Sequence, residues 1–318
     1  MAISIAFVMD PIWTINPKKD STLAMICASL DKGWQVYHVL QNSLNLTQGK
    51  VFSQCQRITQ ASCEAENFYT LADTETIVLD DIDIIMMRKD PPFDMAFIYT
   101  TYLLEQAGRG GALVINRPSS LRDCNEKLFA TQFSKYTPNL CVSSDMSALR
   151  NFVQQQGQAI LKPLDGMGGS SIFKTAADDP NLSVILETLT DHGNTVIMGQ
   201  QYLPEIKDGD KRILMIDGEP VSHSLARIPK AGETRGNLAA GGSGRVQPLT
   251  QSDYAIAHAV GPTLKEKGII FAGLDVIGSH LTEINVTSPT CIREISAATG
   301  IPIAVNLMDT IENKLRAS

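Results

Sequence analysis

The stretch KPLDGMGGSS at positions 162–171 carries the strongest signal for the fold of this chain. Lys162 stands at the end of a strand predicted over 158–162, and the glycines that follow let successive backbone N–H groups converge. A loop of this kind can bind phosphate oxygens, while the lysine ammonium supplies a positive charge. The Gly-Lys-Ser/Thr of a Walker A loop and the Gly-x-Gly-x-x-Gly spacing of a dinucleotide-binding turn are both missing. A phosphate-binding loop and an ordinary hairpin turn therefore both stay open.

A second informative stretch, LDVIGSHLTEINV at positions 274–286, is predicted to form a β-hairpin. Glu283 and Asn285 are two residues apart on one strand, so both side chains point to the same face. If the turn is centred on Ser279, Asp275 lies opposite Glu283 on that face. Two carboxylates and an amide then converge, and a bound hard cation such as Mg²⁺ commonly offsets the repulsion between the two carboxylates. The alternative is the solvated polar face of an alternating strand.

Between these stretches lies a long glycine-rich segment, PKAGETRGNLAAGGSG, at positions 229–244. An irregular segment of this length inside a compact domain is uncommon and is often a mobile lid over a site. Closure of such a lid would deliver Arg235 to a substrate. A surface loop with no role in a site fits the same residues.

The rest of the chain predicts three α/β parts. Residues 1–122 alternate short apolar runs with helical periods, which is typical of a parallel sheet with helical crossovers. The predicted elements there are strands at 3–9, 82–88 and 113–116 and helices at 21–33 and 95–103, while 41–80 shows no clear period. The small part that follows has a helix at 125–136, a strand at 158–162 and a covering helix at 182–189. The last part has strands at 212–216 and 221–227, a helix at 252–267 and the hairpin.

Composition narrows the class of protein. Hydrophobic residues make up 43% of the 318 and charged residues 19%, which is a soluble globular composition. The net charge of -7 argues against a nucleic-acid-binding surface. No basic leader precedes the first apolar run, and no apolar stretch is long enough for a membrane helix, so we expect neither secretion nor a membrane partner. Six scattered cysteines without a Cys-x-x-Cys pair favour reduced thiols in the cytoplasm.

Several motifs taken together resemble the bacterial glutathione synthetases, a family of ATP-grasp ligases. They are MMRKDPP at 86–92, RDCNEKL at 122–128, the loop at 162–171, DGDKR at 208–212, ETRGNLAAGG at 233–242 and EINVTSP at 283–289. The likeness spans nearly the whole chain, and motifs of this length are very specific. It favours a phosphate-binding loop and a metal-binding hairpin over their alternatives.

The resemblance implies an ATP-grasp fold with an N-terminal parallel α/β domain. The expected division is 1–122 on the substrate side, a small ATP-grasp domain at 123–199, and a C-terminal ATP-grasp domain at 200–318 that carries the hairpin and a lid at 228–244. ATP would lie between two small sheets. An assembly of identical subunits, a tetramer, is also expected from the family.

Site residues follow from the same resemblance. Arg212 and Arg235 are expected to act in catalysis. The nucleotide would contact Lys127, Lys162, Gly166, Gly168, Gly169, Ser170, Gln200, Gln201, Tyr202, Leu203 and Asp210, with Gln200 standing where many relatives have Glu. The peptide substrate would contact Arg88, Arg227, Asn285, Ser288 and Thr290. Asp275, Glu283 and Asn285 match the ligands of Mg²⁺, with Mn²⁺ as an alternative.

The implied reaction is the ATP-dependent ligation of γ-glutamylcysteine with glycine through an acyl phosphate, with glutathione, ADP and phosphate as products. A carboxylate resists attack by an amine at neutral pH, so phosphorylation by ATP must activate it first. Another carboxylate–amine ligase of the same fold and a nucleotide-binding protein without turnover are the alternatives. The intact set of lysines and oxygen ligands speaks against lost turnover.

Overall fold

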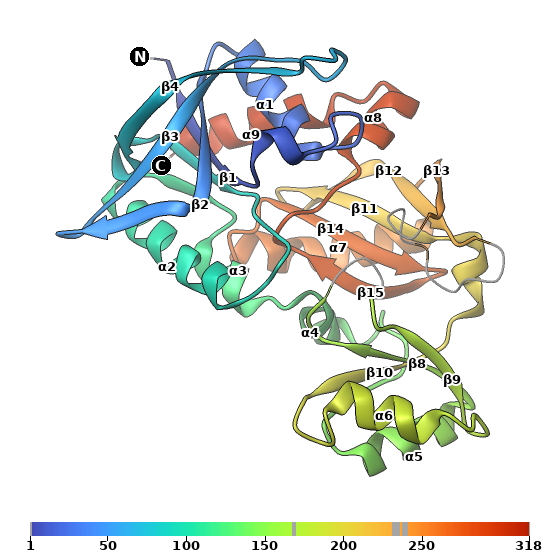
Figure 1. The fold of residues 1–318 in the computed structure, drawn as a ribbon. Helices are drawn as coiled ribbons and strands as arrows, with labels where there is room; N and C mark the ends of the chain where they lie inside the picture. Colours follow the sequence, from blue (N-terminus) through green and yellow to red (C-terminus); the bar gives the residue numbers. More distant parts are fainter. Residues whose placement is uncertain (1, 167–169, 231–235, 237–240, 318) are drawn as a thin grey trace.

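The computed structural model describes residues 2–166, 170–230, 236 and 241–317. Within these residues the strands form three sheets, each in a different part of the chain (Figure 1). We call them the N-terminal domain, with β1–β6, the small domain at 140–201, with β7–β10, and the C-terminal domain, with β11–β15. Among the residues that the structure describes, no helix is both long and apolar enough to cross a membrane.

The N-terminal sheet has the order β4-β3-β2-β1-β5-β6 and is mixed. Its strands are β1 (Ser4–Met9), β2 (Gln35–Thr47), β3 (Lys50–Ala61), β4 (Tyr69–Val78), β5 (Ile84–Met87) and β6 (Leu113–Ile115). The predicted parallel arrangement holds for β2, β1, β5 and β6. The segment at 41–80, for which the sequence predicted no elements, adds β3 and β4 as antiparallel strands, and these make the sheet mixed.

Helices cover both faces of this sheet. Asp20 caps α1 (Ser21–Asp31) by accepting from the Leu23 N–H, and Asp94 caps α2 (Met95–Gly110) by accepting from the Phe97 N–H. Alternate residues of the central strands point to opposite faces. One set packs with α2 and the other with α1, which places the two helices on opposite sides of the sheet.

The small domain has a four-stranded sheet in the order β7-β10-β8-β9. Its elements are β7 (Leu140–Ser143), α5 (Met146–Gln156), β8 (Gln158–Pro163), β9 (Phe173–Ala176), α6 (Leu182–Thr190) and β10 (Ile197–Gln201). Both helices pack on the sheet and enclose a separate hydrophobic core. Before it come α3 (Pro118–Asp123) and α4 (Glu126–Ala130). The helix predicted over 125–136 is therefore shorter than expected, because a 3-10 turn, η3 (Thr131–Phe133), follows α4 at once.

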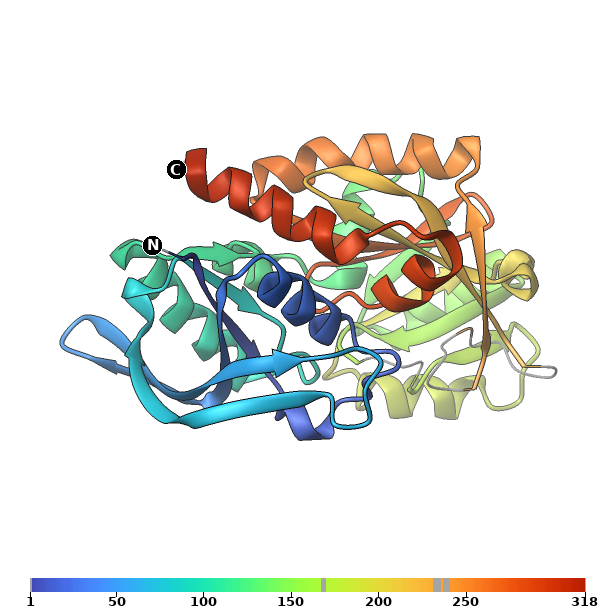
Figure 2. The same ribbon diagram turned by 90° about the horizontal axis from the view of Figure 1, so that it is seen from above.

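The C-terminal sheet is antiparallel, in the order β13-β12-β11-β14-β15. Its elements are β11 (Asp210–Ile216), β12 (Glu219–Ile228), β13 (Ser243–Pro248), α7 (Gln251–Glu266), β14 (Phe271–Ile277), β15 (His280–Asn285), α8 (Ile292–Thr299) and α9 (Ile303–Ala317). The end helix α9 runs beside α1 of the N-terminal domain (Figure 2). Since β12 ends at Ile228 and β13 begins at Ser243, the predicted lid segment is bounded by two paired strands.

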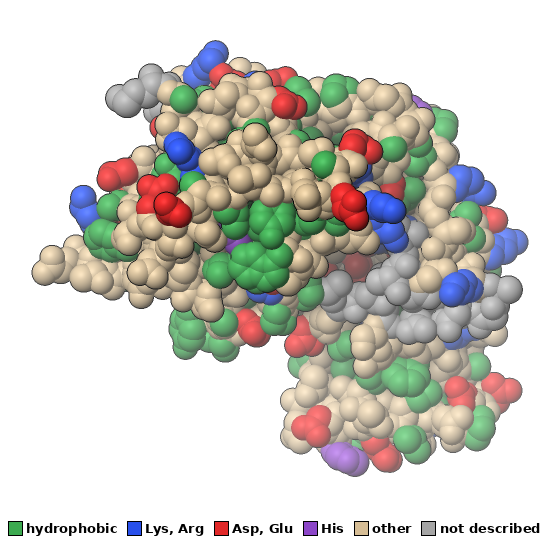
Figure 3. Space-filling view, turned by 45° about the horizontal axis from the view of Figure 1, so that its top comes forward, with side chains coloured by type: hydrophobic (Ala, Val, Ile, Leu, Met, Phe, Trp, Pro, Cys, Tyr) green, Lys and Arg blue, Asp and Glu red, His purple; other side chains and the backbone are tan. Residues whose placement is uncertain are grey.

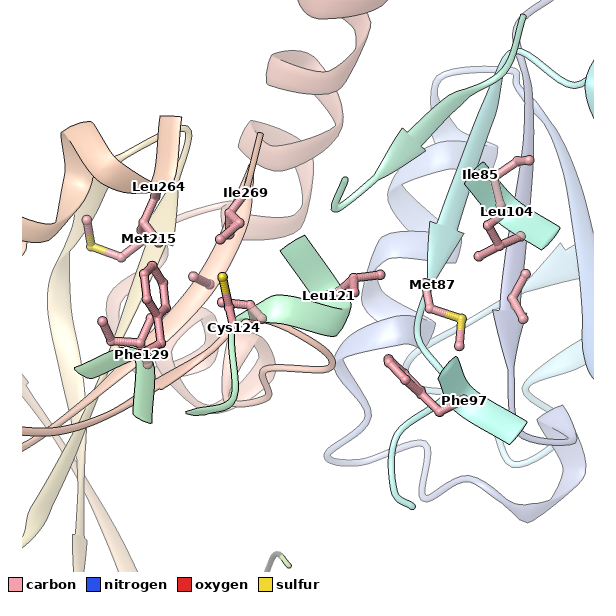
Figure 4. Close-up of a cluster of buried hydrophobic side chains, with 14 of the residues drawn as sticks. Ile85, Met87, Phe97, Leu104, Leu121, Cys124, Phe129, Met215, Leu264 and Ile269 are labelled. Atoms are coloured by element: carbon pink, nitrogen blue, oxygen red, sulfur yellow. The ribbon is translucent and has the colours of Figure 1, made fainter. Parts of the chain in front are cut away.

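The N-terminal and C-terminal domains share two hydrophobic clusters. In one of them, Leu121 of α3 and Cys124, which directly follows α3, lie between side chains of the two sheets (Figure 4). Beside these clusters, the buried side chain of Asn116 joins the domains through four hydrogen bonds. Its Nδ2 donates to the carbonyls of Phe271 and Val286, both at 2.7 Å, and its Oδ1 accepts from the N–H groups of Ile270 and Phe271 at 2.8 and 3.0 Å.

Candidate active site

A cavity of about 540 Å³ lies where the three domains meet. Figure 3 views the face on which the small domain, at the bottom, stands off from the rest of the molecule. Each domain contributes charged or polar side chains to the lining. They are Asp10, Asp20, Thr22 and Arg88 from the N-terminal domain, Glu126 and Lys127 from α4, Lys162, Gln200 and Gln201 from the small domain, and Asp210, Arg212, Arg227, Asp275, Glu283 and Asn285 from the C-terminal domain.

Lys127 reaches the cavity because of how α4 begins. The side chain of Asn125 caps this helix, accepting from the N–H groups of Lys127 and Leu128 at 3.1 and 3.0 Å. The Lys127 ammonium pairs with Glu126 and lies 3.9 Å from Oε1 of Glu283. Burial, the largest effect, lowers the pKa of Lys127, but the charges of Glu283 and Glu126 outweigh it and raise the pKa above its usual value. Lys127 is therefore a buried, permanently charged cation.

Lys162, at the end of β8, is the second cation of this cluster. Its Nζ lies 3.5 Å from Oε1 of Glu283, and the side chain is buried. Glu283 therefore has a lysine from α4 and another from the small domain close to one oxygen. The carboxyl of Glu126 is close as well. Burial and then the charge of Glu283 raise the pKa of Glu126 to about 7.

A buried clamp of two arginines surrounds Asp275. Arg212 donates to it from Nε at 2.5 Å and from Nη2 at 3.0 Å, and Nη2 of Arg227 lies 2.9 Å from its Oδ2. Burial alone would raise the pKa of Asp275, but Arg212 and Arg227 hold it well below its usual range. Arg227 also pairs with Asp210, whose pKa burial raises to about 6. Among the described residues that line the cavity, Oδ1 of Asp210 and Oε2 of Glu294 are buried without a hydrogen-bond partner, so the cavity keeps two unsatisfied acceptors.

The predicted metal ligands lie together. Asp275 is opposite Glu283 in the β14–β15 register, and Asn285 donates to Oδ2 of Asp275 at 3.3 Å. These oxygen donors fit a hard cation such as Mg²⁺. Oδ2 of Asp275 is already occupied by Arg212, Arg227 and Asn285, so Glu283 is the more available ligand. Among the described residues no three His, Cys, Asp or Glu side chains are grouped to hold a metal, so a cation here needs further oxygens, such as those of phosphate.

The stretch from Gln200 to Leu203 lines the cavity at the end of β10. The backbone N–H of Gln201 donates to Asn139 and that of Tyr202 to Gln158, so neither donor is available to a ligand. Lys174 lies over the Tyr202 ring, 3.8 Å from its centroid, and sequence reasoning did not find this contact. Gly166 and Ser170 also line the cavity. Gly168, Gly169 and Arg235 lie outside the described residues.

Arg88 lies on the N-terminal side of the cavity, at the carboxyl end of β5. Its Nε donates to Thr22 at 3.1 Å and its Nη2 to the Pro289 carbonyl at 3.0 Å. Burial lowers the pKa of Arg88 to about 10. Ser288 donates to the Arg88 carbonyl at 3.2 Å, and Thr290 lines the same side. Thus the substrate residues that the sequence predicts are grouped, and all but the three undescribed residues of the predicted site border one cavity.

Sequence reasoning missed other lining residues. Asp10 follows β1, Asp20 caps α1, and Cys291 and Glu294 begin α8, and all four border the cavity. Asp10 had a usable signal, because ligands of open α/β sheets bind at the carboxyl ends of the parallel strands. Cys291 and Glu294 had no signal in the sequence, since their position at the cavity depends on how α8 packs against β12.

A cavity bordered by a small antiparallel sheet and a larger one, with buried lysines facing a carboxylate hairpin, defines an ATP-grasp ligase, an enzyme that joins a carboxylate to an amine with ATP. The model of the prokaryotic glutathione synthetase N-terminal domain matches residues 3–122, and that of the prokaryotic glutathione synthetase ATP-grasp domain matches residues 126–300. The chain belongs to the prokaryotic glutathione synthetase family.

Curated relatives agree over the full length. The chain is 60% identical to the glutathione synthetase of Pseudomonas syringae pv. tomato over 317 residues, which is 100% of this chain and 99% of that one. It is 57% identical to the glutathione synthetase of Pseudomonas aeruginosa, with 100% of both chains covered. Solved structures show the same fold at low identity. D-cycloserine synthetase DcsG has a TM-score of 0.68 at 13% identity, covering 98% of this chain and 99% of that one.

Proposed function

We propose that this protein joins γ-glutamylcysteine to glycine with ATP, giving glutathione, ADP and phosphate. The proposal rests mainly on the contact between the small and C-terminal domains, where Lys127 and Lys162 both approach Glu283. Two buried cations beside an acidic hairpin suit a triphosphate and its divalent cation. The close relatives with the glutathione synthetase name support the choice of substrates.

Activation of the dipeptide carboxylate is the first requirement of the reaction. Its negative charge repels the glycine amine, and oxide is a poor leaving group, so the γ-phosphoryl group of ATP is transferred to it. Lys127 and Lys162 then neutralise the negative charge that develops on the phosphoryl oxygens. The amine of glycine attacks the acyl phosphate, and phosphate leaves. Bound Mg²⁺, held by Glu283, Asn285 and Asp275, would supply further charge neutralisation, and Mn²⁺ has the same ligand preference.

Positioning is the task of the remaining residues. Gly166, Gly168, Gly169, Ser170 and Asp210 are proposed for the nucleotide phosphates and ribose, and Gln200, Gln201, Tyr202 and Leu203 for the base. Arg88, Arg227, Asn285, Ser288 and Thr290 are proposed for the peptide. Arg212 is bound to Asp275 through Nε and Nη2, so its remaining donors are those it offers to substrate. The proposed lid at 228–244 would protect the acyl phosphate from water, and its closure would bring Arg235 to the substrate to act in catalysis.

The arrangement of the chain and of its copies belongs to the same proposal. We divide the chain at 1–122, 123–199 and 200–318, since these ranges nearly match the three sheets; the last two residues of β10 (Ile197–Gln201) pass the second boundary. The family resemblance supports a homotetramer that works in the cytoplasm.

An assay of ADP release tests the proposal. The purified protein with ATP and Mg²⁺ should release ADP rapidly only when γ-glutamylcysteine and glycine are both present. Lys162→Met should lower this rate by at least 100-fold, because one of the two phosphate cations is lost. Lys50→Met, at an exposed lysine on β3, is the matched control and should leave the rate unchanged. No stimulation by the two substrates together, with stimulation by another acid and amine, would assign a different ligase activity.

A further inference from the structure

Two cysteines face each other outside the nucleotide cavity. Cys27 lies on α1, Cys63 lies in the connection between β3 and β4, and their Sγ atoms are 3.5 Å apart. Both residues are half-buried, so a small reagent can reach them. Neither lines the cavity of the candidate active site.

The surroundings hold Cys63 in place and favour its ionisation. Arg293 of α8 donates from Nη1 to the Cys63 carbonyl at 2.9 Å and to the Pro17 carbonyl, and from Nη2 to Glu64 at 2.9 Å. The hydrogen bond from Cys27, with a smaller effect of Arg293, lowers the pKa of Cys63 to about 7, against the opposing effect of burial. The same hydrogen bond raises the pKa of Cys27. Cys63 is thus about half ionised to the nucleophilic thiolate at neutral pH, and Cys27 is a thiol beside it.

We propose that Cys27 and Cys63 form a reversible disulfide, which makes the pair a redox-modification site on the N-terminal domain. A disulfide needs the two sulfurs at about 2.05 Å, so the Sγ atoms must approach by about 1.5 Å. The oxidant is a small-molecule disulfide, of which oxidised glutathione is the natural representative for a chain of this family.

The exchange proceeds in two balanced steps. The Cys63 thiolate attacks one sulfur of the small disulfide, whose S–S bond breaks and releases one small thiolate. Cys27 loses its proton to that thiolate and attacks the Cys63 sulfur of the mixed disulfide, which releases the second small thiolate. The two protein thiols are oxidised together, and the small disulfide is reduced to two thiols.

The disulfide would tie α1 to the β3–β4 connection. The first turn of α1 borders the active-site cavity at Asp20, Ser21 and Thr22, and Thr22 accepts a hydrogen bond from Arg88. The bond closes a loop between positions 36 apart, which restricts the unfolded chain. Oxidation should therefore raise the melting temperature by several degrees, and a reducing dithiol should reverse the shift.

The test treats the full-length protein with oxidised glutathione, blocks free thiols with an alkylating reagent, and analyses the peptides by mass spectrometry. The original sequence should give a Cys27–Cys63 cross-link. Cys27→Ser should instead give a Cys63–glutathione mixed disulfide, at least tenfold more abundant than the same mixed disulfide in the original sequence. Cys63→Ser should leave Cys27 unmodified and abolish the melting shift. Cys141→Ser, at another half-buried cysteine, is the control and should behave as the unmodified chain.

Three results would overturn the proposal. One is the absence of the cross-link at a glutathione disulfide concentration that modifies a free peptide thiol. Another is equal modification of Cys141 and Cys63. The third is a cross-link that a reducing dithiol does not reverse.

Discussion

Replacement of Asn116 by alanine should weaken the joint between the N-terminal and C-terminal domains. The Asn116 side chain makes four hydrogen bonds, all to backbone groups of the segments at 270–271 and 286. At a net value of about 1 kcal/mol for each bond, Asn116→Ala should lower the free energy of unfolding by about 4 kcal/mol. Because Asn116 is buried, water cannot take over these bonds without opening the joint.

Urea unfolding followed by fluorescence and circular dichroism measures this loss. The matched control is Asn45→Ala, since the exposed Asn45 side chain makes one hydrogen bond, to the Ser43 carbonyl, and should contribute less than about 0.5 kcal/mol. The reasoning is refuted if Asn116→Ala costs less than about 1 kcal/mol, because the four backbone groups would then find other partners at no cost.

Three further predictions concern the charged cluster and a close helix contact. The pKa of Glu126 is about 7 in the folded protein, against an ordinary 4.5, so the folded state binds more protons than the unfolded state between these pH values. The melting temperature of the ligand-free protein should therefore fall as the pH rises from 5 to 8. Glu126→Gln should reduce that fall, and an equal fall in the variant would contradict the assignment. Glu283→Gln should lower the rate of ADP release more than tenfold at saturating Mg²⁺, because a metal ligand and the carboxylate facing Lys127 and Lys162 are lost. An unchanged rate would exclude the metal role. Gly261→Ala places a Cβ 2.2 Å from the Gly218 carbonyl oxygen and should lower the free energy of unfolding in urea by about 1–3 kcal/mol. The control Gly108→Ala, whose Cβ lies 3.4 Å from Val114, should leave the free energy of unfolding unchanged. Equal stability of the two variants would show that α7 can shift freely.

The local part of the site could be predicted from the sequence. A turn centred on Ser279 predicted Asp275 opposite Glu283, and the structure confirms this pairing, although the turn lies at 278–279 and a register shift between Asp275 and Val276 produces the alignment. Capping was equally local, because Asp20 lies directly before the apolar period of α1. In such cases the residues that meet are close in sequence, so one periodicity fixes both positions.

The arginine clamp could not be derived from spacing. Arg212 meets Asp275 because β11 pairs with β14, and Arg227 meets Asp210 because β11 pairs with β12. A one-residue change in either register would turn these side chains to the opposite face, and no local pattern sets the register between distant strands. The strands β3 and β4 were missed for a related reason. Irregular pairing near Gln56 and Ile58 interrupts the alternation of β3, and β4 has no buried residue to form an apolar face.

The small domain keeps its hydrophobic core to itself, and that separation has a mechanical consequence. Because Leu149, Leu161 and Leu186 pack only within this core, the small domain can swing about the chain segments at its two ends without exposing apolar surface. The strands that carry Lys162 and Glu283 would then separate and rejoin at the cost of polar contacts alone. Hydrogen exchange should accordingly report residues 140–201 as an independently opening unit, with ligands slowing exchange at its inner edge.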